Sequence, residues 1–191
     1  MNETTARQLL ELLKQKGISV DRGLTHDEQL AIEQALGAKL PPDLAILLAE
    51  GVPVANAEGE TKAFPQWTVN PAQAIADAQS QIEAAFEFDI KNSDYWHESL
   101  GQKPENLDEA VDQALTVIRQ WPPLVRIYSH RFMPTDPHEP GNPVISVFQA
   151  GDTVYYGSNL LEYFAKEFGL DIAYTSSSPK PIPYWGDAFW S

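Results

Sequence analysis

Hydrophobic positions in the first 50 residues recur every three or four residues, which is the spacing of an amphipathic helix. The first apolar stripe ends at Gly17. A second helix begins at Thr25, because Thr25 and Glu28 have the spacing of a capping box. Pro41 and Pro42 open a third helix, since proline suits the first helical turn. The pattern therefore predicts three short helices before residue 51.

The middle of the chain has a less regular pattern. Residues 51–61 have the composition of a loop, and residues 64–67 are expected to form a short strand or a packed loop. Asn70 begins a weakly amphipathic helix. The clearest helix of the chain covers residues 107–120, where apolar residues follow the i, i+3, i+4 rule until Pro122.

The pattern then changes from helices to strands. Runs rich in β-forming residues cover 124–128, 144–149 and 153–156, and the last two are joined by a turn sequence typical of a hairpin. Ser158 or Asn159 caps a final helix. Helices that precede a cluster of strands predict an α+β fold with an antiparallel sheet.

The chain contains no repeat and no linker long enough to separate two domains, so its 191 residues are expected to form one domain. The last segment, residues 176–191, is rich in proline and aromatic residues. Trp185, Phe189 and Trp190 are expected to pack against the body, because so apolar a free tail would be prone to aggregation.

Composition narrows the possible functions. The absence of cysteine excludes disulfides, cysteine-based zinc sites and a thiol nucleophile. The net charge of −14 repels nucleic acid and anionic membranes and favours basic partners. There is no apolar run of membrane-spanning length, no secretory signal and no glycine-rich phosphate loop. We therefore expect a cytoplasmic protein that binds no cofactor, no nucleic acid and no membrane.

Acidic residues are concentrated between residues 83 and 112, where nine acids accompany two lysines. The acids are Glu83, Glu87, Asp89, Asp94, Glu98, Glu105, Asp108, Glu109 and Asp112. They form either a solvated face or a docking surface for a basic protein. Within this segment, Tyr95 and Trp96 are either an interface anchor or a seal for the core.

The densest polar group lies in residues 130–143, between two predicted strands. His130, Asp136, His138 and Glu139 could ligate zinc or act as acid and base, but their spacing matches no metal motif. A second interpretation is a rigid, proline-stiffened connection in which Arg131 pairs with Glu139 and the imidazoles bond backbone carbonyls. A third is a binding surface. We expect no metal and no catalytic residue here.

The candidate partner-binding residues come from both polar segments. They are Asp89, Asp94, Tyr95, Trp96, Glu98, His130, Arg131, Asp136, His138, Glu139 and Asn142.

Three stretches together resemble the SUKH superfamily, which includes fungal cell-wall-assembly regulators and bacterial immunity proteins. The first runs from Gly-Leu-Thr at 23–25 to Leu-Pro-Pro-Asp at 40–43, and the second is Asp-Ile-Lys-Asn-Ser-Asp-Tyr-Trp at 89–96. The third and most specific combines Tyr-Ser-His-Arg-Phe-Met-Pro at 128–134 with residues 137–144 and 155–160. The tail at 181–185 is also similar. Residues 1–22 have no counterpart and are assigned as an N-terminal helical extension of a SUKH-like domain at 23–191.

The resemblance implies a bent, mostly antiparallel sheet flanked by helices and a binding role, frequently against nuclease or other toxins. It carries over no catalytic residues. Three hypotheses follow: an immunity protein that neutralises a basic toxin, an intracellular regulator or scaffold that binds a housekeeping protein, and a metal-dependent enzyme that uses residues 130–142.

Overall fold

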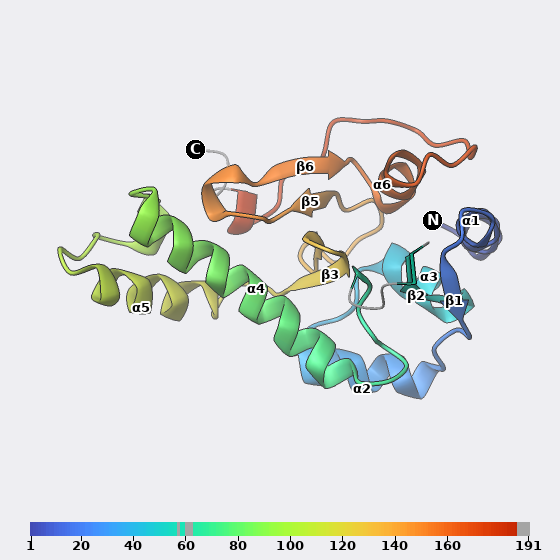
Figure 1. Cartoon of the computed structure of the whole chain (residues 1–191), viewed down its shortest axis with the longest axis horizontal. Coiled ribbons are helices and arrows are strands. Elements are labelled where there is room, and N and C mark those ends of the chain that lie inside the picture. Colours follow the sequence, from blue (N-terminus) through green and yellow to red (C-terminus); the bar gives the residue numbers. More distant parts are fainter. Residues whose placement is uncertain (57, 60–62, 187–191) are drawn as a thin grey trace.

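Helices begin and end at the capping residues that the sequence supplies. The computed structural model describes residues 1–56, 58–59 and 63–186 (Figure 1). Thr25 accepts a hydrogen bond from the Glu28 backbone while the Glu28 carboxylate accepts one from the Thr25 backbone, which completes the predicted capping box. Gly37 ends the same helix in the left-handed conformation, at a φ of 72°. The α-helices of the described residues are α1 (Glu3–Gln15), α2 (His26–Leu36), α3 (Pro42–Glu50), α4 (Pro71–Asn92), α5 (Leu107–Ile118) and α6 (Leu160–Glu167).

The strands of the described residues form two small antiparallel sheets, neither of which is closed or curled. One sheet pairs β1 (Ser19–Asp21) with β2 (Val52–Ala55). The other has the order β3 (Leu124–Tyr128), β4 (Arg131–Pro134), β5 (Val144–Ser146) and β6 (Val154–Gly157). The predicted α+β single-domain fold is confirmed.

Two sequence expectations about these strands are wrong. Residues 51–61 contain strand β2 where a loop was expected, because Val52 is fully buried and its strand pairs with β1. The stretch expected to link two strands begins with a strand of its own, β4, which lies between β3 and β5. The turn at 150–152 is a short 3₁₀ helix, η3 (Ala150–Asp152), and it joins β5 to β6 as a hairpin.

The larger sheet separates two hydrophobic clusters. Alternate residues such as Val125 and Met133 face the cluster formed with α1, α2, α3 and α6. Their neighbours Leu124 and Phe132 face the cluster formed with α4 and α5. Residues 1–22 are part of this arrangement, because the buried side of α1 belongs to the first cluster and β1 pairs with β2.

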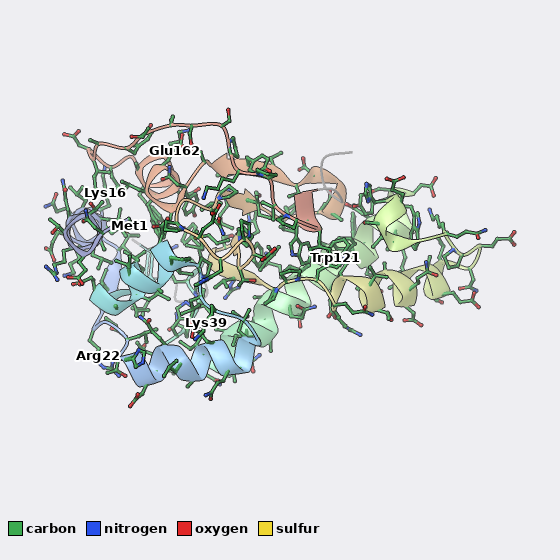
Figure 2. The ribbon with its side chains drawn as sticks, turned by 180° about the vertical axis from the view of Figure 1, so that it is seen from behind. Met1, Lys16, Arg22, Lys39, Trp121 and Glu162 are labelled. Carbon is green, nitrogen blue, oxygen red and sulfur yellow. The ribbon has the colours of Figure 1, made fainter. Side chains whose placement is uncertain are left out.

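The tail packs where the α4–α5 hairpin joins the sheet. Figure 2 shows Trp121 at this junction, next to the end of α5. Trp185 and Ile182 are buried against the same cluster. The other two aromatic residues expected to pack, Phe189 and Trp190, lie outside the described residues.

Candidate functional site

Helices α4 and α5 form a hairpin: the first turns of α4 pack against β3, and the rest of the hairpin extends away from the sheet (Figure 1). We call residues 71–119 the acidic arm. Buried residues of both helices, including Phe86 of α4 and Val111 of α5, hold the arm together. Arg119 makes two hydrogen bonds of 2.8 Å to the Glu83 carboxylate, which ties the end of α5 to the middle of α4. No helix among the described residues, the 22-residue α4 included, is long and apolar enough to cross a membrane.

The acidic arm carries half of the net charge of the chain. It holds ten of the 27 acids and three of the 13 lysines and arginines, against a net charge of −14 for all residues. Five of its acids are in ion pairs or buried, among them Glu87 and Asp108, which share Lys91. The other five are exposed and make no ion pair with any residue that the structure describes. One of these is Asp77, which accepts a hydrogen bond from Gln73. The four unpaired acids within residues 98–112 are Glu98, Glu105, Glu109 and Asp112.

The segment 94–98 lies at the turn of the arm, between α4 and η2 (Glu98–Leu100). Trp96 is half-buried against the core of the arm, and its indole Nε1 donates to the Gly101 carbonyl at 2.8 Å. Tyr95 packs edge-on against Phe86, and burial raises the pKa of its hydroxyl to about 12. Asp94 is exposed and pairs with Lys103. Both aromatic residues thus help to close the core while part of each stays accessible.

Asp89 was predicted to lie on the partner-binding surface, but it is buried. Its side chain is only 2% exposed, because it lies on the inner side of α4 facing η3. Its carboxylate accepts hydrogen bonds from the Gly151 backbone N–H at 2.7 Å and from the Ser93 hydroxyl at 3.2 Å. Asp89 therefore anchors the β5–β6 hairpin to the arm and presents no charge to a partner.

The sequence pattern did not predict that two apolar residues of the arm, Phe88 and Leu107, are exposed. Phe88 is 48% exposed on α4 and Leu107 is 45% exposed at the first position of α5. Helical spacing could have identified Phe88, because it falls outside the stripe formed by Phe86, Asp89 and Ile90. Each adds apolar surface next to acidic residues.

The residues of the second polar segment are not brought together. His130 lies beside β4, with its ring 5.4 Å from that of Phe148 and its Nδ1 3.1 Å from the Ser129 hydroxyl. Burial and the charge of Arg131 lower the pKa of the His130 imidazole. His138 instead lies 3.2 Å from the Leu40 carbonyl, next to the start of α3.

The predicted pair between Arg131 and Glu139 is wrong. Arg131 is buried because β4 is an inner strand, and its guanidinium lies 3.6 Å from the centre of the Tyr156 ring. It also donates to Ser146 at 3.1 Å and lies 3.7 Å from the Glu167 carboxylate. Glu139 pairs with Lys180 at 2.7 Å.

The remainder of this segment is a connection fixed to the body. Asn142 is fully buried and donates to the carbonyls of Pro134 and Pro137, at 3.2 and 2.7 Å. Gly141 donates its backbone N–H to Asp43 of α3 at 2.7 Å. Asp136 is exposed and precedes a cis proline. The described residues contain no group of three or more potential metal ligands.

Comparisons of the sequence with protein-family models and with curated proteins, and of the structure with solved structures, found no match.

Proposed function

We propose that the chain is a non-enzymatic protein-binding module and that its acidic arm meets a basic protein partner. The observation that carries this proposal is the group of four unpaired acids on a helical hairpin that extends away from the sheet. Surface ion pairs contribute little to stability, and acids without a basic neighbour contribute still less. Their shared effect is an electrostatic field, which attracts proteins of opposite charge.

The partial exposure of the aromatic residues supports a docking role for the same surface. Trp96 and Phe88 present aromatic area among carboxylates, and aromatic residues contribute much of the binding energy at protein interfaces. Lys103 and Lys91 are each engaged by an acid of the arm, so neither offsets the four unpaired acids.

The resemblance to the SUKH superfamily supports a more specific assignment. Its members combine helices with a mostly antiparallel sheet, and the α+β fold with an antiparallel four-stranded sheet is compatible with that arrangement. The partner class implied by the resemblance is a basic, nuclease-type toxin. In this proposal the chain is an immunity protein that covers such a toxin.

The proposal is tested by capture of partners from cells of the native host, followed by affinity measurements with the purified partner. The variant replaces Glu98, Glu105 and Glu109 with glutamine and Asp112 with asparagine. The matched control makes the same change in charge at four exposed acids outside the arm. These are Asp27, Glu58, Asp152 and Asp171.

We expect a basic partner whose affinity falls in the arm variant and is retained in the control. Equal affinity for both variants, or capture of acidic proteins only, would contradict the proposal. If the captured basic partner is a housekeeping protein, the proposed binding role stands but the assignment as an immunity protein against a toxin is wrong.

A further inference from the structure

A pocket of about 450 Å³ lies at the base of the acidic arm, between the first turns of α4, the segment before it and strand β3. Phe64, Val69 and Ala74 provide its apolar lining. Gln73, Asp77 and Arg126 provide polar and charged groups. Its volume is in the range of sites that bind small molecules.

Arg126 is the unusual member of this lining. It lies half-buried on β3, and its guanidinium makes no hydrogen bond or ion pair with any residue that the structure describes. Its Nε is shielded from solvent as well. Burial lowers the pKa of the guanidinium, which is the physical sign of a cation removed from water without full compensation.

The other four arginines of the chain each have a carboxylate partner. The pairs are Arg7 with Glu50 at 2.6 Å, Arg22 with Glu28 at 2.6 Å, Arg119 with Glu83 at 2.8 Å and Arg131 with Glu167 at 3.7 Å. Acids outnumber lysines and arginines by 27 to 13, so carboxylates are abundant. Buried charges in proteins are normally paired. Half-buried Arg126 is therefore a cation that has no partner among the residues that the structure describes.

Asp77 does not fill that role. Its carboxylate accepts a hydrogen bond from the Gln73 side chain at 2.8 Å and forms no ion pair with Arg126. It acts on Arg126 only as a more distant charge that raises the pKa of the guanidinium. Arg126 thus lines the pocket without an ion-pair partner among the described residues.

We propose that this pocket binds a small organic acid through its carboxylate, with Arg126 as the cation that receives it. A guanidinium matches a carboxylate with two parallel N–H···O bonds. Val69, the exposed apolar residue of the lining, then contacts the carbon skeleton of the acid. The carboxylate carries one negative charge and so neutralises Arg126, the one cation of the described lining.

A phosphate group fits this pocket less well. A phosphate ester carries up to two negative charges near neutral pH, and only Arg126 balances them in this lining. The second charge would meet Asp77 in a protein of net charge −14. The single guanidinium beside one carboxylate therefore selects a monocarboxylate.

The test uses N-acetylglycine as the probe and N-acetylglycinamide, its uncharged counterpart, as the matched control compound. Binding is followed by the backbone amide NMR signals of residues that line the pocket, such as Gln73 and Ala74, which every variant retains. We expect saturable shifts with N-acetylglycine, with a Kd on the order of 1 mM for so small a probe, and at least a tenfold weaker response to the amide.

Two variants separate recognition from folding. Arg126→Gln should lose at least about tenfold in affinity, one hydrogen-bonded ion contact being worth 1.4 kcal/mol or more. Val69→Glu places a carboxylate at a position 75% exposed, where folding tolerates it, and should also weaken binding. The backbone spectrum of each variant reports on its fold. Equal responses to the acid and the amide, no saturation with wild type, or full affinity in Val69→Glu would overturn the proposal.

Discussion

The indole of Trp185 stands at 88° to that of Trp121, with ring centroids 4.9 Å apart, and its Nε1 donates to the Pro122 carbonyl at 2.7 Å. Truncation of so buried an aromatic side chain leaves a cavity and an unsatisfied carbonyl. We predict that Trp185→Ala lowers the free energy of unfolding by about 3–5 kcal/mol in chemical denaturation. The control Tyr184→Ala, at a position 51% exposed, should change it by less than about 1 kcal/mol. A change of less than about 1 kcal/mol in Trp185→Ala as well would show that the tail does not stabilise the body.

Glu162 is buried at the start of α6, where Figure 2 labels it. Burial by itself raises the pKa of its carboxyl group, but hydrogen bonds from Lys166, Ser158 and Ser176 outweigh burial and lower this pKa to about 2. Because the folded pKa lies below the ordinary value of 4.5, the carboxylate stabilises the fold above pH 4.5. This contribution is lost as the pH falls from 4.5 toward 2.

We predict that Glu162→Gln lowers the free energy of unfolding by about 2 kcal/mol at neutral pH, because charge-assisted hydrogen bonds become neutral ones. The difference from wild type should shrink as the pH is lowered to about 3, measured by denaturation at each pH. Glu105→Gln, at an exposed and unpaired position, is the control and should differ little from wild type. A difference that stays constant with pH would contradict the assigned pKa.

Local signals predicted the α-helices and the strands β3, β5 and β6 because those signals are confined to a few residues. The capping box at Thr25 and the asparagine caps at Asn106 and Asn159 each bond to the backbone within three positions. The start of α4 at Asn70 was likewise predicted. Its continuation to Asn92 was not followed, because the weak apolar pattern depends on α5 and the sheet to bury it.

Contacts between distant segments could not be read from the sequence. The partner of Arg131 is set by the position of β4 inside the sheet, which brings Glu167 of α6 next to it, 36 residues away in the chain. Asp89 looked like part of an acidic surface, whereas its burial depends on the hairpin that carries Gly151. The pocket at Arg126 likewise required α4 and β3 to be placed side by side.

Tyr163 is fully buried, and its hydroxyl makes no hydrogen bond with the residues that the structure describes. Burial raises the pKa of this hydroxyl well above its ordinary value. Because an unsatisfied buried polar group costs about 1–3 kcal/mol, we predict that Tyr163→Phe raises the free energy of unfolding. The control Tyr174→Phe, at a position 41% exposed, should leave it unchanged. A loss of stability in Tyr163→Phe would indicate a hydrogen-bond partner for the hydroxyl.

His130 and His138 occupy separate places, beside Phe148 and beside Leu40. We therefore predict that the purified chain holds no stoichiometric zinc and that added zinc leaves the melting temperature unchanged. Metal analysis and thermal denaturation check this. If wild type retains zinc through purification and a His130→Ala/His138→Ala double variant does not, residues 130–142 form a metal site and the interpretation as a fixed connection is wrong.

Trp96 and the unpaired acids should affect different kinetic constants of partner binding. Trp96 is half-buried, and its hydrogen bond to the Gly101 carbonyl fixes the indole in place. In the proposed interface its exposed part makes short-range contacts with the partner, which Trp96→Ala removes. We predict that Trp96→Ala mainly speeds dissociation, at a cost of about 2 kcal/mol or more. Binding kinetics with the captured partner, together with a check of the fold by circular dichroism, measure this. Unchanged affinity with an intact fold would exclude Trp96 from the interface.

The most direct test of the central claim is the association rate of the captured partner at two salt concentrations. It is measured with wild type, with the arm variant lacking the charges of Glu98, Glu105, Glu109 and Asp112, and with the control lacking four acids elsewhere. At low salt, wild type and the control should associate about tenfold or more faster than the arm variant. High salt should remove this difference, because the screening length falls from about 10 Å at 0.1 M to about 3 Å at 1 M. Equal association rates for wild type and the arm variant at low salt would contradict the claim that the acidic arm attracts the partner.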